Sequence, residues 1–444
     1  MSEQPQPVIV GSGLTGMAIS RTLANARVPH VLVGGPPGTV PRLGESLNLE
    51  GTIGLWELFP ELSRFYYPKK VVTGYLGDRV IECSFDTDAK AISRVVFGAL
   101  GYRAVPEFLQ FDRLGFDAAL WEATAANQYC TVVDRKVAAL EYDGERDAFC
   151  AVRLADGSEI RPGYLFDASN HGRLLGKAAG LEHRTIGEPQ RVAFTHYHAA
   201  PGTPLNTEPW EVATVIVRLF RDDWGIDAVA WCIPLGSYVS IGISLLAAES
   251  DLPNDELLEL AERAFARYGV HYRRRFTTAA PIQSLDHQYF IYDRAYGGNW
   301  LLAGPSFCQV WWMAGAGVGT AFAAAQVAPD VVRDPLGAGR RYEDYIKVLE
   351  GIHYTFEFFA STPREEVTPE GLHRASDRFV VTNLVRLARS TKLRPARLPR
   401  LLAGPIEWAM TRPRTIHEYC RVDWAPPAPA PAARPARALA GAEA

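Results

Sequence analysis

The chain has few cysteines, little net charge and no long apolar run, and each absence excludes a class of protein. Its 444 residues include six cysteines, with no Cys-x-x-Cys pair and no zinc-ligand spacing, so we expect reduced thiols and no metal site. The net charge of −4 gives no reason to expect nucleic-acid binding. No uninterrupted apolar run reaches the roughly 18 residues of a membrane span. With a short polar segment before the first predicted strand, we expect a cytoplasmic protein without a signal peptide or transmembrane segment.

What the sequence does contain is a glycine fingerprint close to its start. A short apolar strand runs into Gly11-x-Gly13-x-x-Gly16, and an apolar-faced helix follows. In such a loop the first glycine permits the turn, the second lets a pyrophosphate approach the backbone, and the third lets the helix pack on the strand. The helix N-terminus offers unpaired N–H groups to the phosphates. The loop predicts a dinucleotide site at Gly11, Gly13, Leu14, Thr15 and Gly16.

One residue that such a site usually has is missing. An acidic residue normally ends the second strand, about twenty residues on, and holds the ribose hydroxyls. The second strand is predicted at 30–33, and it ends in Gly34-Gly35 without a carboxylate. The adenosine end of the cofactor is therefore either held by another group or bound weakly.

Several further segments resemble, in order, motifs of the flavoproteins that include aromatic hydroxylases, geranylgeranyl reductases and flavin-dependent halogenases. Gly44-Glu45-Ser46 resembles the G-E-S/T element near the flavin, and the D-R-x-x-F-D segment around Arg113 resembles a helix start that contacts FAD. A later D-A-S stretch and a glycine-rich turn into a helix are similar to the remaining fingerprints. The resemblance extends the predicted cofactor site to Gly44, Glu45, Ser46, Arg113, Asp167, Gly304, Gly317 and Val318.

Three positions depart from the pattern of that class. Gly34 replaces the ribose-binding acid, Asn170 replaces the glycine of D-A-S-G, and Pro305 replaces the aspartate that binds the ribityl chain. The small-residue turn that ends at Gly317 remains, and its backbone N–H groups suit flavin O2 or a chloride ion. These departures favour weak, transient or altered use of FAD.

The halogenase branch is favoured by a lysine. In that branch a lysine follows the G-E-S/T element along the chain and handles the hypohalous acid, and Lys69 and Lys70 stand in the corresponding region. The alternative is that either residue is a surface lysine at a strand start. Trp231-x-Ile-Pro-Leu resembles the W-x-W-x-I-P stretch of halogenases, with Val229 in place of the first tryptophan.

A histidine pair and several aromatic residues complete the candidate set. His196 and His198 are expected on the same face of a strand, where they form an acid–base or metal pair, or a hydrogen-bonded sheet face. The aromatic residues line a cavity or belong to the core. The catalytic candidates are Lys70, Lys69, Glu45 and His196. The substrate-binding candidates are Trp231, Trp311, Trp312 and His198.

The expected fold is α/β, with a doubly wound FAD-binding (Rossmann-like) domain interleaved with an antiparallel substrate-binding sheet and followed by a helical C-terminal region. The FAD-binding domain is expected to be discontinuous, over 1–85, 105–185 and 295–335. The remaining expected parts are a substrate-binding domain at 86–104 and 186–294, a helical region at 336–424 and a disordered Pro/Ala-rich tail at 425–444.

The resemblance implies a flavin-dependent oxidoreductase, halogenase-like or monooxygenase-like, that uses reduced FAD and O2. The substrate would be a hydrophobic aromatic or polyketide-like metabolite, free or bound to a carrier protein, and chloride or bromide would be needed for halogenation. No second glycine fingerprint for a nicotinamide cofactor occurs, so we expect a separate flavin reductase. The arginine-rich segment 374–421 is either a surface for an acidic carrier or a membrane, or a solvated helix face.

Two other functions stay open from the sequence alone. The first is a non-redox cyclase or isomerase on the same fold, with flavin structural or absent and Glu45, His196 or His198 as the acid–base group. The second is a non-catalytic binding protein that has lost its cofactor.

Overall fold

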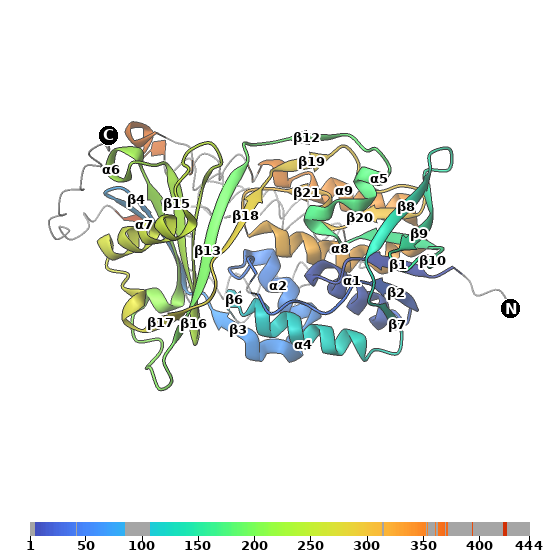
Figure 1. Cartoon of the computed structure of the whole chain (residues 1–444), viewed down its shortest axis with the longest axis horizontal. Helices are drawn as coiled ribbons and strands as arrows, with labels where there is room; N and C mark the ends of the chain where they lie inside the picture. Colours follow the sequence, from blue (N-terminus) through green and yellow to red (C-terminus); the bar gives the residue numbers. More distant parts are fainter. Residues whose placement is uncertain are drawn as a thin grey trace, which may run out of the picture.

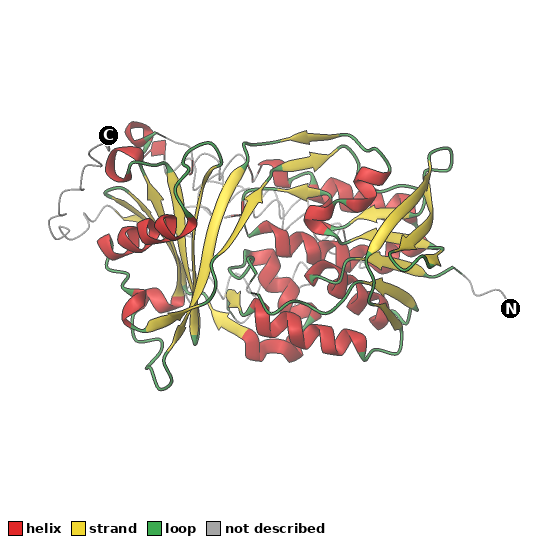
Figure 2. Cartoon of the chain, viewed as in Figure 1, coloured by secondary structure: helices red, strands yellow, loops and turns green. Residues whose placement is uncertain are grey.

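The computed structural model describes residues 5–40, 42–84, 107–312 and 315–351, and short pieces at 353, 360, 363–368, 370–371, 393 and 421–423. The predicted segment 86–104, the tail 425–444 and almost all of the arginine-rich segment lie outside these residues. Within them, helices surround a parallel sheet in one half of the molecule, and the other half is a large, mostly antiparallel sheet (Figures 1 and 2).

The parallel sheet has five strands in the order β20-β11-β1-β2-β7. Its strands are β1 (Pro7–Val10), β2 (His30–Val33), β7 (Cys130–Val133), β11 (Tyr164–Asp167) and β20 (Trp300–Leu302). Most of their residues are apolar and buried, as expected for strands that are covered on both faces. The predicted return of the 163–167 strand to this sheet is confirmed, because β11 pairs in parallel with β1.

Three long helices pack around this sheet, namely α1 (Leu14–Asn25), α4 (Arg113–Ala125) and α8 (Ala316–Arg333). α1 lies against the alanine-rich α8, and Thr22 Oγ1 donates a hydrogen bond of 2.6 Å to the carbonyl of Ala325. Small side chains allow this close approach of the two helices. The N-termini of α1 and α8 are therefore fixed relative to each other. The remaining helical elements of this half are α2 (Leu49–Leu58), η1 (Pro60–Phe65), η2 (Asn170–Gly172), α5 (Leu174–Ala178), η5 (Gly304–Ser306) and α9 (Pro335–Ile346).

The second half is a nine-stranded sheet in the order β17-β13-β16-β15-β14-β4-β5-β22, with β18 also paired to β13. Its strands are β4 (Val71–Leu76), β5 (Arg79–Ser84), β13 (Gln190–Ala199), β14 (Ala213–Leu219), β15 (Ala228–Leu235), β16 (Tyr238–Leu246), β17 (Phe276–Ala279), β18 (Gln283–His287) and β22 (Arg421–Asp423). The antiparallel sheet predicted between residues 191 and 247 is confirmed. Short helices accompany it at η3 (Pro209–Val212), α6 (Arg221–Trp224), η4 (Tyr272–Arg274) and η7 (Arg364–Glu366).

One helix covers the outer face of this sheet, and two strands from an early part of the chain join it. α7 (Asn254–Arg267) buries Leu257, Ala261 and Phe265 against the sheet (Figure 1). β4 and β5 also belong here, because β4 pairs in parallel with β14 from Ala213 opposite Val71 onward. Residues 71–84 therefore lie in the large sheet, within the range 1–85 that the sequence predicts for the first segment of the FAD-binding domain.

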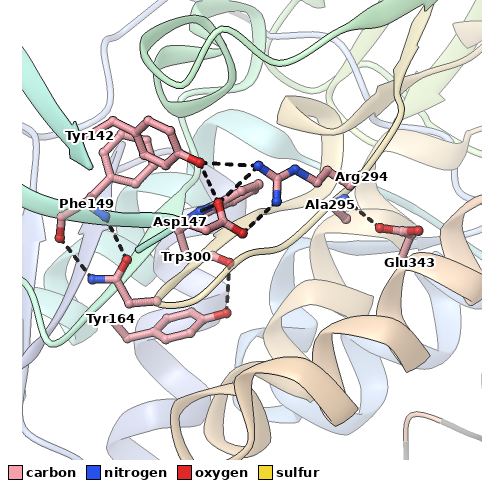
Figure 3. A network of polar contacts seen from close by, with 9 residues as sticks. Tyr142, Asp147, Phe149, Tyr164, Arg294, Ala295, Trp300 and Glu343 are labelled. Carbon is pink, nitrogen blue, oxygen red and sulfur yellow. Dashed lines mark hydrogen bonds and ion pairs between the residues drawn. The ribbon is translucent and has the colours of Figure 1, made fainter. Parts of the chain in front are cut away.

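Smaller sheets flank the parallel one. They are built by β8 (Val137–Asp143), β9 (Ala148–Leu154) and β10 (Glu159–Ile160), by β12 (His183–Thr185), β19 (Phe290–Tyr292) and β21 (Cys308–Gln309), and by β3 (Tyr66–Pro68) and β6 (Leu109–Phe111). The β8–β9 hairpin is tied to β20 by a polar network (Figure 3). Asp147 pairs with Arg294 at 2.6 Å and accepts hydrogen bonds from Tyr142 and Trp300. These groups satisfy one another, so the network is structural. The predicted α/β fold class is confirmed by this architecture.

Candidate cofactor and catalytic site

The glycine loop between β1 and α1 contains glycines of two kinds. A Cβ at Gly16 would lie 1.9 Å from the carbonyl oxygen of Gly11, and a Cβ at Gly11 (φ +108°) would lie 2.4 Å from the carbonyl oxygen of Ala168. Packing of the backbone therefore requires both glycines. A Cβ at Gly13 would meet only Asn170 Nδ2, at 3.8 Å. Gly13 thus leaves an open approach to the first turn of α1, as a pyrophosphate would need.

Two further predicted positions gather at this helix start, around Thr15. Thr15 Oγ1 donates a hydrogen bond of 3.3 Å to Asn170 Oδ1, and a Cβ at Gly304 would lie 3.5 Å from Thr15 Cγ2. Asn170 has φ +52°, a left-handed conformation that asparagine tolerates better than most residues. The replacement of glycine by Asn170 therefore preserves the backbone of this loop.

Asp167 lies inside the protein, at the end of β11. Its carboxylate accepts hydrogen bonds from Ser169 N and Oγ, Leu175 N and Ser306 Oγ, at 2.6 to 3.1 Å. Burial raises its pKa, although these hydrogen bonds act in the opposite direction. The carboxylate is fully buried, so Asp167 positions the loops after β11 and β20.

The Gly44–Ser46 element meets the start of α8 and the start of α4. A Cβ at Gly44 (φ +100°) would lie 2.9 Å from Arg113 Nη1 and 3.5 Å from Val318 Cγ2. Arg113 donates a hydrogen bond of 2.8 Å to the carbonyl of Leu43 and is paired with Asp117 at 2.8 Å. The structure thus brings together Gly44, Arg113 and Val318, which are far apart in the sequence.

The η5 turn that follows β20 carries the third departure from the flavoprotein pattern. Gly304 (φ +55°) donates its N–H to Tyr342 Oη at 2.7 Å, and Pro305 follows it in η5. A Cβ at Gly317 would meet only Pro305 Cγ, at 3.9 Å, so this helix start is open as well. Pro305 supplies no carboxylate, and the Asp167 carboxylate, which contacts this turn through Ser306 Oγ at 3.1 Å, is fully buried.

Glu45 forms a buried pair with a histidine of the opposite half. Glu45 Oε1 lies 2.5 Å from His196 Nε2, and both side chains are 2% exposed. Among the described residues, Glu45 Oε2 and His196 Nδ1 have no hydrogen-bond partner. The ring of Tyr238 lies 5.3 Å from that of His196, and burial raises the pKa of Tyr238. The pair lies where the half with the parallel sheet meets β13.

Ser46 connects to a second polar cluster, which contains Lys69. Lys69 is 6% exposed, and its Nζ donates to Ser46 Oγ at 3.2 Å and to the carbonyl of Leu47. Ser46 Oγ is hydrogen-bonded to Thr214 Oγ1 at 2.8 Å, and Thr214 donates to Gln110 Oε1. Adjacent residues of an extended segment face opposite sides, which separates this cluster from the Glu45–His196 pair.

Lys70 differs from Lys69 although the two are neighbours between β3 and β4. Its side chain is exposed, and its backbone N–H donates to the carbonyl of Val212 at 2.9 Å. The surface interpretation therefore applies to Lys70, and Lys69 is the lysine beside the G-E-S element.

The predicted substrate residues form a row of rings. The ring centroids of Trp231 and Trp312 are 4.6 Å apart, and those of Trp312 and Trp311 are 5.8 Å apart. Trp231 and Trp311 are buried, whereas Trp312 is partly exposed. His198 is exposed, and its ring lies 5.5 Å from the ring of Tyr238. Partial desolvation of the imidazole, together with the nearby His196, lowers the pKa of His198. His196 and His198 share the Tyr238 side of β13, as the period of a strand predicts.

Sequence reasoning missed the polar residues that join the two halves. Gln110 Nε2 donates to the carbonyl of Pro234 at 2.8 Å, and Tyr238 Oη donates to Asp112 Oδ1 at 2.7 Å. The sequence could have identified Gln110, because a glutamine within the apolar strand β6 is expected to be buried and a buried polar side chain needs hydrogen-bond partners. No sequence pattern near Tyr238 or Thr214 indicates that these residues join the two halves.

The described residues contain neither a metal-ligand cluster nor a membrane-spanning helix. Among them, no group of three histidine, cysteine, aspartate or glutamate side chains lies close enough to hold a metal ion. None of the helices there is both long and apolar enough to cross a membrane.

Comparison with known proteins establishes the fold. No family model matches the chain, and no curated protein matches it. A flavin-dependent brominase is 16% identical to this chain, with a TM-score of 0.62. The match covers 91% of this chain and 98% of the brominase chain. A probable FAD-dependent monooxygenase from Pseudomonas aeruginosa is 15% identical, with coverages of 84% and 99% and a TM-score of 0.62. A halogenase variant solved in complex with FAD is 14% identical, with coverages of 92% and 86% and a TM-score of 0.64. The chain therefore has the fold of flavin-dependent halogenases and monooxygenases.

Proposed function

We propose that this protein is a flavin-dependent oxidoreductase that uses FAD, with a halogenase-like or monooxygenase-like reaction. The observation that carries the proposal is the convergence of sequence-distant motifs on two open helix starts. Thr15, Asn170 and Gly304 meet at α1, and Gly44, Arg113 and Val318 meet at α8. Structural packing does not account for the open space at Gly13 and Gly317, whereas a bound dinucleotide does.

The residues present fit FAD at its phosphates and beside its ring. The first-turn N–H groups of α1, from Leu14 onward, would hold the pyrophosphate above Gly13. The backbone at Gly317 and Val318 and the Gly44–Ser46 element would border the flavin. When bound and reduced, FAD supplies the activation of O2. The protein positions the substrate and excludes water from the reacting atoms.

Lys69 is the residue that would direct a halogenation. Its ammonium group is buried at the junction of the two halves, where it would donate a hydrogen bond to a hypohalous acid and aim the halogen at the substrate. The N–H groups at the start of α8 would hold chloride or bromide. In the hydroxylation version, the substrate reacts without help from a lysine.

The substrate and the redox partner are part of the same proposal. The ring row of Trp231, Trp311 and Trp312 favours a hydrophobic, aromatic or polyketide-like metabolite, free or attached to a carrier protein. Reduced flavin would come from a separate reductase. His198 would contribute to substrate contact at the Tyr238 side of β13.

The test compares the two neighbouring lysines. Purified protein is titrated with FAD, then supplied with reduced FAD, O2, bromide and a panel of phenols and indoles, with products identified by mass spectrometry. Lys69→Met should lower halogenation at least about a hundredfold with unchanged FAD affinity, because methionine keeps the buried stem and removes the donor. Lys70→Met is the matched control and should keep full activity.

The outcomes separate the versions of the proposal. Equal halogenation by both variants would exclude a role for Lys69. Oxygenated products without a bromide requirement would assign the monooxygenase version. No FAD binding in either redox state, or no substrate-dependent O2 uptake, would contradict the proposed function.

A second candidate function is favoured by the Glu45–His196 pair. Each partner has one buried polar atom without a partner among the described residues, and a carboxylate–imidazole pair can transfer protons. A non-redox cyclase or isomerase would use this pair and would turn over without reduced flavin. Loss of such turnover in Glu45→Gln, with retained folding by circular dichroism, would support this candidate.

A further inference from the structure

Asp134 lies where the sequence lacks the acid that usually holds the adenosine ribose. It follows the edge strand β7, and Gly34-Gly35 follows the neighbouring strand β2. Val33 lies opposite Val133 in a parallel pair, and Gly34 N donates to the Val133 carbonyl at 3.0 Å. The carboxyl ends of the two strands therefore bring Asp134 beside Gly35.

The carboxylate of Asp134 takes the space that a side chain at position 35 would fill. A Cβ at Gly35 would lie 2.5 Å from Asp134 Oδ1. The neighbouring Arg135 is paired with Asp156, with Nε and Oδ2 3.0 Å apart. No hydrogen bond or ion pair to the Asp134 carboxylate occurs within the described part of the chain, and the residue is exposed. The carboxylate is thus accessible to a ligand at the end of β2.

The backbone explains why the acid does not stand on β2 itself. Gly34 has φ +146°, and a Cβ there would lie 2.5 Å from Ser12 Oγ and 3.0 Å from Ser12 N. Ser12, within the glycine loop, donates a hydrogen bond of 2.6 Å to the carbonyl of Gly35. This close contact between loop and turn excludes an aspartate at position 34, and it also keeps Asp134 next to the glycine loop.

We propose that Asp134 binds the ribose hydroxyls of the adenosine part of FAD, in place of the acid missing from β2. This inference rests on the proposed use of FAD. One carboxylate accepts hydrogen bonds from two neighbouring hydroxyl groups, and such charge-assisted bonds are stronger than neutral ones. The adenosine end is then held from the edge strand, while the pyrophosphate is held at α1.

Binding constants measured by flavin fluorescence test this assignment without any turnover. The ligands are FAD, an FAD analogue that lacks both adenosine ribose hydroxyls, and FMN, which lacks adenosine. Asp134→Asn should weaken FAD binding about tenfold, because hydrogen bonds to a charged group are lost. The wild type should bind the analogue about as weakly as Asp134→Asn binds FAD, and the variant should bind both ligands equally.

Two controls make the result specific. Asp156→Asn removes another exposed carboxylate near Arg135 and should leave the affinity for FAD unchanged. FMN should bind the wild type and Asp134→Asn with the same affinity. Unchanged FAD affinity in Asp134→Asn, or an equal loss for FMN, would overturn the role of Asp134 while leaving FAD use intact. Failure of the wild type to bind FAD would overturn both proposals.

Discussion

The loop before α1 and the turn before α8 both place small residues at a helix start, and each combines glycines that packing requires with one that it does not. In the first, Gly11 and Gly16 are required because a Cβ would meet backbone atoms at 2.4 and 1.9 Å. In the second, a Cβ at Gly317 would meet nothing closer than 3.9 Å. Folding therefore dictates two of the glycines in the first loop. A Cβ at Gly315 (φ +57°) would lie 3.1 Å from the backbone atoms Asn48 N and Ser46 O, so folding explains Gly315 in the second segment but does not explain Gly317.

This difference shows how structural and functional glycines are told apart. Gly13 stands in the first loop but resembles Gly317, because its nearest potential contact is 3.8 Å away. A fingerprint of three glycines thus contains two that hold the strand and helix together and one that leaves room for a phosphate. Substitutions at these positions should separate the two roles.

The largest effect is expected for Gly16→Ala. The added Cβ meets the Gly11 carbonyl oxygen, which belongs to the backbone and cannot turn away, so overpacking should cost about 3 kcal/mol of unfolding free energy or prevent folding. Urea denaturation followed by circular dichroism measures this cost. A loss below about 0.5 kcal/mol would show that the loop relaxes and that backbone packing does not require a glycine at position 16.

Gly13→Ala should spare the fold and impair the site. Its Cβ has space in the protein, so the unfolding free energy should change by less than about 0.5 kcal/mol. The methyl group would stand between the backbone and a pyrophosphate, so FAD affinity should fall about tenfold or more, equivalent to about 1.4 kcal/mol. Calorimetric titration with FAD, beside the same urea experiment, measures both quantities. Unchanged affinity would argue against a pyrophosphate at this loop.

The smallest effect is expected for Gly317→Ala. Gly317 lies within the first turn of α8, and alanine there should raise the unfolding free energy by about 0.5–1 kcal/mol because it limits the unfolded chain. FAD affinity should fall only a few-fold, because in the proposed site the first turn of α8 borders the flavin and does not hold the pyrophosphate. Thermal unfolding without FAD measures the expected gain in stability, and the additional stabilisation by FAD measures the expected loss of affinity. If Gly317→Ala lost as much FAD affinity as Gly13→Ala, the starts of α1 and α8 would contribute equally to FAD binding.

Much of the fold was predictable because its signals are local. The apolar strand, glycine loop and helix near the chain start, the strand at 164–167 and the alternating region from 191 to 247 all carry patterns within a few residues of one another. The pairing of β4 with β14 was not predictable, because strand pairing between segments so far apart along the chain leaves no local signal in the sequence.

The candidate site was predictable only as a list of residues. Sequence motifs named Glu45, Lys69 and His196 but did not say which of them meet. The structure pairs Glu45 with His196 and places Lys69 on Ser46. It also brings Asp134 to the turn at Gly35, which no motif indicates.

The sequence by itself determined the class of fold and the kind of cofactor loop, because hydrophobic period and glycine spacing act over short stretches of chain. Only the tertiary structure decided which of two adjacent lysines is buried, which carboxylate meets which histidine, and which strand presents an acid beside Gly35. Those outcomes depend on the register and packing of segments that are distant in the chain, and burial is a property of the assembled molecule rather than of any single residue.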